Sequence, residues 1–256
     1  MTGDYTELQV TTEYSFLRGA SLTEELFARA AVLGMKALAV TDRNTLAGIA
    51  RAHHRARETG IRLIVGCRLD LADGPSVLVY PMDRAGYSRL TRLLTVGKGR
   101  AGKGQCTLYW ADLSVAAEGL IGILCNDQNE LNIRRLKRDF GDRGYVALTL
   151  MHRPNDAVRL RTVADTAGML GVPVVATNDV LYHAHGRRIL QDVLTCIRES
   201  CTIDELGFRR ERSVVRQLQS PEEMTRLFTR HADAIVRTQE IADRCRFSLD
   251  ELRYQY

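Results

Sequence analysis

The chain is organised around one stretch, Leu8-Gln9-Val10-Thr11-Thr12-Glu13-Tyr14-Ser15-Phe16-Leu17-Arg18-Gly19, which is typical of a strand end running into a turn. Side chains two apart on a strand share a face, so positions 9 and 11 have the spacing of two metal ligands. Two histidines there would begin a metal site. The chain has Gln9 and Thr11 instead, and both are poor ligands for a transition metal. The stretch therefore predicts a metal site whose ligands have been replaced.

Outward from this stretch, apolar strand-like segments alternate with helical segments. Alternation with short links favours parallel strands covered by helices. This many units predict an α/β fold, a distorted (β/α)7-type barrel rather than an open sheet, although the sequence leaves closure open. The expected strands are 5–10, 36–42, 61–71, 76–80, 119–125, 145–150 and 172–179, with 61–71 and 76–80 paired as a hairpin. The expected helices include 22–33, capped by Ser21 and Glu24, and 45–58, 83–96, 130–140, 156–170 and 185–199.

The last part of the chain has a different character. We expect residues 1–200 to form the barrel and residues 201–256 to form an Arg-rich loop and a helical extension. Ser220 and Pro221 predict the start of a helix over 221–228, with a second over 232–245. The ending at residues 252–256 has no closing signal, which indicates a longer polypeptide.

Composition limits the class of protein. The chain has 256 residues, of which 45% are hydrophobic and 26% charged, as in an ordinary globular domain. No apolar run approaches a membrane span and no signal peptide is visible, so we expect a cytoplasmic protein without a membrane partner. The net charge of +5 permits contact with nucleic acid, and a solvated basic surface is the alternative. The six cysteines form no C-x-x-C pair, which predicts reduced thiols.

A basic, glycine-rich segment at 97–104 meets part of a phosphate-loop pattern. Gly104 stands where Ser or Thr must bind magnesium, and the segment follows a predicted helix rather than a strand. We reject a phosphate loop and predict a mobile basic loop.

Polar residues cluster where the predicted strands end. The carboxyl ends of parallel barrel strands share one face, and that face carries the site. This face would collect Gln9, Thr11, Asp42, Arg43, Arg68, the pair 126–127, His152 and Asp179. Asp42 and Asp179 are the best candidates for surviving functional carboxylates. The alternative is that strand ends are polar simply because loops are.

Three arginines oppose those carboxylates. If Arg18, Arg43 and Arg68 share the mouth of the barrel with Asp42 and Asp179, guanidinium groups fill the space that a cation would need. Arginine stays charged and forms bidentate hydrogen bonds with carboxylates, so such a lattice would hold the face together without metal. The alternative is that each arginine points outward to solvent.

These residues resemble the PHP (polymerase and histidinol phosphatase) domain of bacterial C-family DNA polymerases. Residues 9–19 are similar to its first motif, H-x-H-[ST]-x-[YF]-S running on to L-D-G. Residues 41–48, TDRNTLAG, are similar to T-D-H-G-N-L-x-G, and residues 66–68, GCR, stand where the family has G-x-E. Residues 176–182, ATNDVLY, resemble A-T-N-D-V-H-Y, and 191–199 is similar to the segment that follows. The segments 17–21, LRGAS, and 41–44, TDRN, resemble those of the damage-inducible, error-prone members of the family.

The resemblance implies a distorted β/α barrel and, where the site is intact, a metal-dependent phosphoesterase or proofreading exonuclease. Here it implies a vestigial metal site at Gln9, Thr11, Arg18, Asp42, Arg43, Arg68, Asp179 and Leu181. We expect no catalytic residue and no metal in this chain. Any metal that did bind would use Asp42, Asp179 and His152, and the alternative function is a residual phosphoesterase or 3′–5′ exonuclease.

The resemblance also implies a larger parent protein. That parent would be a DNA-directed DNA polymerase acting in damage-induced translesion synthesis and repair, with this chain as its scaffold. Its Mg²⁺ would belong to a downstream polymerase module. That module and DNA are the expected partners, and other mutagenesis and replisome proteins are further candidates.

Overall fold

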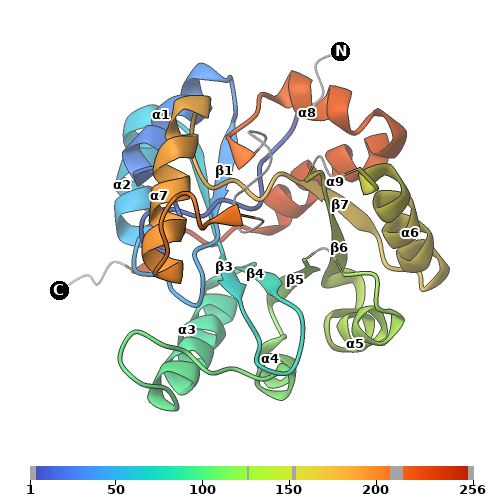
Figure 1. Cartoon of the computed structure of the whole chain (residues 1–256). Coiled ribbons are helices and arrows are strands. Elements are labelled where there is room, and N and C mark those ends of the chain that lie inside the picture. Colours follow the sequence, from blue (N-terminus) through green and yellow to red (C-terminus); the bar gives the residue numbers. More distant parts are fainter. Residues whose placement is uncertain (1–3, 126, 152–153, 208–215, 253–256) are drawn as a thin grey trace.

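The structure is a computed structural model that describes residues 4–125, 127–151, 154–207 and 216–252. Its strands are β1 (Ala37–Val40), β2 (Arg62–Val65), β3 (Cys67–Leu69), β4 (Val77–Pro81), β5 (Leu120–Leu124), β6 (Gly144–Thr149) and β7 (Val174–Thr177). Its helices are α1 (Thr23–Val32), α2 (Ile49–Thr59), α3 (Arg84–Gly99), α4 (Trp110–Ala116), α5 (Glu130–Phe140), α6 (Asp156–Met169), α7 (Arg188–Glu199), α8 (Pro221–Leu227) and α9 (Ala232–Arg244). Figure 1 shows helices around the outside of the strands, with α1 and α2 opposite α5 and α6.

The strands follow one another around a distorted barrel, as the alternation predicts. β1 pairs with β2 in parallel, and β3 to β7 form a second sheet in chain order. The extended segment 7–10 joins them: the Ala39 N–H donates to the Glu7 carbonyl over 2.9 Å, and the Val180 N–H donates to the Gln9 carbonyl over 2.8 Å. On the other side, the Arg68 N–H donates to the Asp42 carbonyl over 3.0 Å. Backbone pairing therefore continues from the first segment around to the segment after β7.

One pairing differs from the parallel order that the alternation predicts. β4 runs antiparallel to β5 as well as to β3. The tight turn at 72–75 reverses the chain after β3, so β4 runs against both of its neighbours. The β5–β6 and β6–β7 pairs are parallel, as expected.

An apolar cluster fills the barrel interior, with Tyr80, Ile123 and Val175 among its buried members. Ile241 and Cys245 of α9 pack into the same cluster. The Tyr145 hydroxyl at the start of β6 donates to Glu240 over 2.7 Å, so α9 lies at the amino ends of the strands. The opposite end of the barrel, where the strands finish, is left for polar residues.

The helix starts agree with prediction at one end of the chain and differ at the other. α8 is capped as predicted, because the Ser220 hydroxyl accepts from the Glu223 N–H over 3.2 Å. The predicted cap of the first helix is wrong by one residue: the N-cap is Leu22, whose N–H donates to Glu25. Ser21 is unavailable as a cap because its hydroxyl lies 2.8 Å from Nδ1 of His183.

The basic segment at 97–104 is only partly the loop that we predicted. α3 continues through Gly99. Only glycine fits at position 97, because a Cβ there would lie 2.6 Å from the Cys106 sulfur. The segment does follow a helix, which agrees with the rejection of a phosphate loop. Of the predicted Arg-rich loop, residues 208–215 lie outside the described residues, and the domain boundary at residue 200 stays a prediction. Within the described part of the chain, every helix is too short or too polar to cross a membrane.

Candidate functional site

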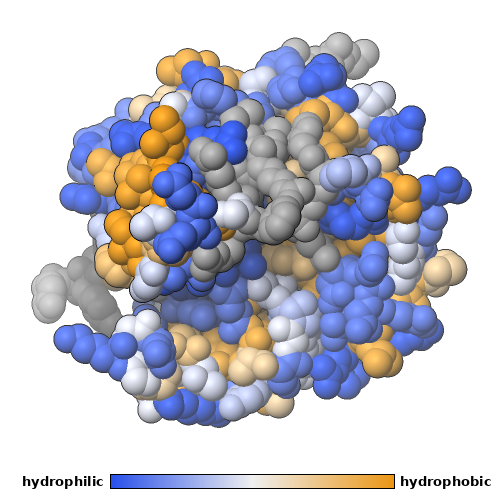
Figure 2. Space-filling view, viewed as in Figure 1, coloured by the Kyte–Doolittle hydropathy of each residue, from blue (hydrophilic) through white to orange (hydrophobic). Residues whose placement is uncertain are grey.

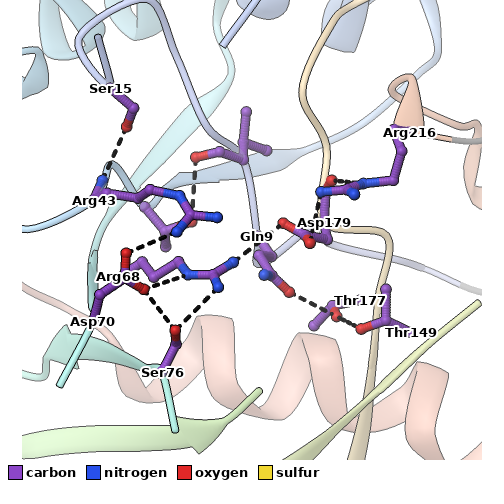
Figure 3. Close-up of polar contacts among 12 residues, drawn as sticks. Gln9, Ser15, Arg43, Arg68, Asp70, Ser76, Thr149, Thr177, Asp179 and Arg216 are labelled. Atoms are coloured by element: carbon purple, nitrogen blue, oxygen red, sulfur yellow. Dashed lines mark hydrogen bonds and ion pairs between the residues drawn. The ribbon is translucent and has the colours of Figure 1, made fainter. Parts of the chain in front are cut away.

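Hydrogen-bonded polar side chains lie at the carboxyl ends of the strands (Figure 3). The Thr177 hydroxyl donates to Oε1 of Gln9 over 3.0 Å, and the hydroxyls of Thr177 and Thr149 are 2.7 Å apart. All three side chains are buried. Thr11 is also buried, and its N–H donates to the Val180 carbonyl over 2.9 Å. Gln9 and Thr11, which the resemblance places at ligand positions of the motif, are thus both buried in the fold.

Asp42 is buried and bound to hydroxyl and amide groups rather than to arginine. Its carboxylate accepts the Thr12 N–H at 2.8 Å, the Thr12 hydroxyl at 2.7 Å and the Ser15 hydroxyl at 2.6 Å. Burial raises the pKa of Asp42 above its usual value, against the lowering effect of these hydrogen bonds. The Ser15 hydroxyl in turn accepts the Arg43 N–H over 2.9 Å. Asp42 therefore anchors the turn at 12–19, and the arginine–aspartate lattice that the sequence leaves open does not extend to Asp42 among the described residues.

Asp70 is the carboxylate that the arginines share. Nη1 of Arg43 lies 2.7 Å from its Oδ2, and Nε of Arg68 lies 3.0 Å from its Oδ1. The Ser76 hydroxyl donates to the same Oδ1 over 2.5 Å and accepts from Nη2 of Arg68 over 3.0 Å. Burial alone would raise the pKa of Asp70, but Arg43 and Arg68 lower it to about 2. Arg43 and Arg68 are thus held in place by the carboxylate of the residue that follows β3.

Asp179 is the second centre of the network. Its Oδ2 lies 2.6 Å from Nη2 of Arg216, and its Oδ1 lies 3.7 Å from Nη1 of Arg68. Nε of Arg216 also donates to the Asp179 carbonyl over 2.5 Å. Although burial opposes it, the Arg216 and Arg68 charges lower the pKa of Asp179. Arg68 therefore bridges Asp70 and Asp179, so of the two arrangements that the sequence leaves open for Arg68, the structure has the ion pair with Asp179.

The other predicted positions differ in their surroundings. Arg18 is half-buried and, among the described residues, no carboxylate pairs with it. Leu181 is buried against Ala20 and Tyr182 in a small apolar cluster. Asp127 accepts from the Asn129 N–H over 2.8 Å at the start of α5. His152 lies outside the described residues, as does the Asn at position 126.

Sequence reasoning missed four residues of this region: Glu7, Asp70, Ser76 and Arg216. Glu7 is buried, accepts from the Tyr5 hydroxyl over 2.7 Å and the Gln9 N–H over 2.8 Å, and burial raises its pKa to about 7. Asp70 could have been found, because it shares a strand face with Arg68 two residues earlier. Arg216 carries no comparable signal, since its position depends on the return of a distant segment.

The observed residues do not fit a divalent metal cluster. Among the described residues, no group of three or more His, Cys, Asp or Glu side chains could hold a metal ion. The two carboxylates at the mouth already face three guanidinium groups, whose charge would repel a cation. Asp42 has its oxygens directed at the 12–19 turn. Among the described residues, the mouth of the barrel therefore presents guanidinium groups rather than the set of ligands that metal-assisted hydrolysis requires.

The barrel has the fold of solved hydrolases. An amidohydrolase from Chromobacterium violaceum superposes with a TM-score of 0.50 at 17% identity, covering 69% of this chain and 87% of that one. A protein assigned as a metal-dependent phosphoesterase, from Bifidobacterium adolescentis, superposes with a TM-score of 0.50 at 14% identity, covering 68% and 86%. At these identities the likeness shows the fold alone.

The chain belongs to the PHP domain family, whose model matches residues 7–172. Error-prone DNA polymerase 2 of Rhizobium meliloti is 57% identical over 98% of this chain, and error-prone DNA polymerase 1 of Agrobacterium fabrum is 59% identical over 98%. The error-prone DNA polymerase of Caulobacter vibrioides is 47% identical over 98%. The chain spans 24% of the length of each of these relatives.

Proposed function

We propose that this chain is the N-terminal PHP domain of an error-prone DNA polymerase and serves there as a scaffold without hydrolytic activity of its own. Identity of 57–59% to error-prone polymerases over nearly the whole chain supports the first part. The catalytic carboxylates for nucleotide transfer and their Mg²⁺ would lie in a downstream polymerase module. DNA synthesis across damage, and any contact with other mutagenesis or replisome proteins, would belong to the longer polypeptide.

One observation carries the second part: Arg68 bridges Asp70 and Asp179 at the place where the motif would hold metal. A hydrolytic metal site must generate hydroxide and bind phosphate oxygens, which needs open cation positions. The ion pairs instead tie the ends of β3 and β7 together. The site thereby contributes to stability rather than to chemistry.

A hydrolysis assay tests the proposal. The purified chain is incubated with Mn²⁺ or Zn²⁺ and either single-stranded DNA or a nitrophenyl phosphodiester. We expect no metal-dependent hydrolysis above the buffer rate. Hydrolysis that disappears in Asp179→Asn and persists in the exposed-site control Asp165→Asn would overturn the proposal and favour the residual phosphoesterase or exonuclease, provided that both variants remain folded by circular dichroism.

A further inference from the structure

A hollow lies beside the ion-pair network, between the turn at 12–19 and the segment 97–107. Its volume is about 860 Å³. Phe16 and Arg18 line one wall, Lys98 and Lys103 line the other, and Arg43 connects the hollow to the network. In Figure 2 the surface falls back, with hydrophilic side chains, between the part built on α7 and the part built on α3. We call this hollow the basic groove.

Most of the charged side chains that line the basic groove are positive. Four cationic side chains line it, against a single carboxylate, that of Asp70. Asp70 is already bound by Arg43 and Arg68, so it neutralises neither lysine. Lys98 and Lys103 are exposed, and neither has an ion pair with any described residue. The groove therefore presents uncompensated positive charge at its open side.

Arg18 is held among like charges. Burial and the neighbouring Arg43 and Arg198 lower the pKa of the Arg18 guanidinium. Nη1 of Arg198 is fixed nearby, donating to the Leu17 carbonyl over 2.9 Å. Like charges that face each other in a partly dry site raise the energy of the protein, and a bound anion would relieve this repulsion.

Phe16 gives the groove an aromatic edge. Its side chain is 83% exposed although it is one of the largest apolar residues of the chain. The turn that carries it is closed by the Arg18 N–H donating to the Ser15 carbonyl over 2.9 Å, with Leu17 in the left-handed region. Asp42 fixes Ser15 through its hydroxyl. The turn therefore holds Phe16 outward at a defined place instead of burying it.

We propose that the basic groove binds single-stranded DNA, with backbone phosphates on Arg18, Lys98 and Lys103 and one base stacked on Phe16. Cations that follow a backbone, together with an exposed ring, are the two parts of a sequence-tolerant single-strand site. A duplex keeps its bases stacked inside, so it could use the cations but not the ring. The choice of DNA as ligand rests on the proposed function. Its test is independent of the hydrolysis assay because it measures equilibrium binding.

The experiment measures the affinity of the intact chain for a fluorescent thymidine dodecamer by anisotropy, between 50 and 200 mM salt. Contacts to three phosphates predict a slope of about −2 in a plot of log K against log salt, at roughly 0.7 per phosphate. Lys98→Ala/Lys103→Ala should reduce the slope by about 1.4. Phe16→Ala should weaken binding by about tenfold and leave the slope unchanged.

A matched control separates this site from general attraction. Arg84 and Arg92 are exposed on α3, the helix that carries Lys98, and they do not line the groove. Arg84→Ala/Arg92→Ala removes the same charge and should keep the slope. Equal effects of the two double variants, an unchanged affinity in Phe16→Ala, or duplex DNA bound as tightly as the single strand would each overturn the proposal. Phe16→Ala is informative because so exposed a side chain contributes little to folding.

Discussion

At the scale of single residues, Asp70 is the side chain on which the arginines depend. Replacing it by Asn leaves Arg43 and Arg68 partly buried beside a neutral amide. Breaking a buried pair typically costs 3–5 kcal/mol, and because a third of the Asp70 side chain is exposed we expect about 2 kcal/mol. Urea unfolding of Asp70→Asn measures the loss. Asp165→Asn, which breaks an exposed pair with Arg161, should cost less than about 0.5 kcal/mol, and equal losses would contradict the role of Asp70.

Glu7 predicts a pH dependence of stability. Its pKa is about 7 in the folded chain and roughly 4.3 when unfolded, so the folded state holds the proton more tightly. Stability should therefore fall as the pH rises from about 4.3 to about 7, and this contribution should then level off. Between pH 5 and 7.5 the loss due to Glu7 should be about 2 kcal/mol.

The variant Glu7→Gln removes this titration and can still accept from the Gln9 N–H. We expect the difference in unfolding free energy between pH 5 and pH 7.5 to shrink by that amount. Glu118→Gln, at an 80% exposed side chain, should leave the difference unchanged. A Glu7→Gln protein with the pH dependence of the parent would show that Glu7 is ionised throughout.

At the scale of elements, the turn at 12–19 closes against its own backbone at Gly19. A Cβ at this position would lie 2.2 Å from the Thr12 carbonyl oxygen, so the turn cannot close around alanine. We expect Gly19→Ala to destabilise the chain by at least about 2 kcal/mol in thermal or urea unfolding. The control Gly168→Ala adds a Cβ with nothing within 4 Å, and a helical glycine should gain about 0.5–1 kcal/mol. A neutral Gly19→Ala would mean that the turn closes differently.

The elements also show where sequence reasoning is sufficient. The amphipathic pattern predicts the helix at 130–140 with its observed bounds. In the structure the Asn129 side chain caps its start and Gly141 follows its last residue. The sequence predicts Ser21 as a cap, but local sequence cannot reveal that His183, far along the chain, contacts its hydroxyl. The sequence does not predict the antiparallel β4–β5 pair for a similar reason. The relative direction of two strands depends on which strands pair in the fold and not on local periodicity.

For the site, the sequence places residues but not their partners. The sequence places Arg43, Arg68 and Asp179 at one face because it groups all three near the carboxyl ends of the predicted strands. The pairing of Arg68 with Asp70, and the entry of Arg216 from beyond residue 207, depend on the tertiary fold. The sequence also leaves the partner of Asp42 open, and in the fold Thr12 and Ser15 of the first motif bind it.

At the scale of the whole molecule, ion pairs join the strand ends at the face where we propose that the metal site of the family has been lost. Arg43, Arg68 and Arg216 join the ends of strands through Asp70 and Asp179, while α9 closes the opposite end. The same face carries the basic groove, so positive charge dominates both the mouth and its surroundings. A protein with this distribution should attract phosphate-bearing ligands and repel divalent cations.

The most direct test of the proposed replacement of metal ions by arginine–aspartate pairs is the metal content of the purified, untagged chain. The protein is dialysed against Zn²⁺ and Mn²⁺ and then against metal-free buffer, and bound metal is measured by mass spectrometry. We expect well below one ion per chain, because guanidinium groups occupy the cation positions. Two or more tightly held ions per chain would contradict the replacement of metal by arginine–aspartate pairs.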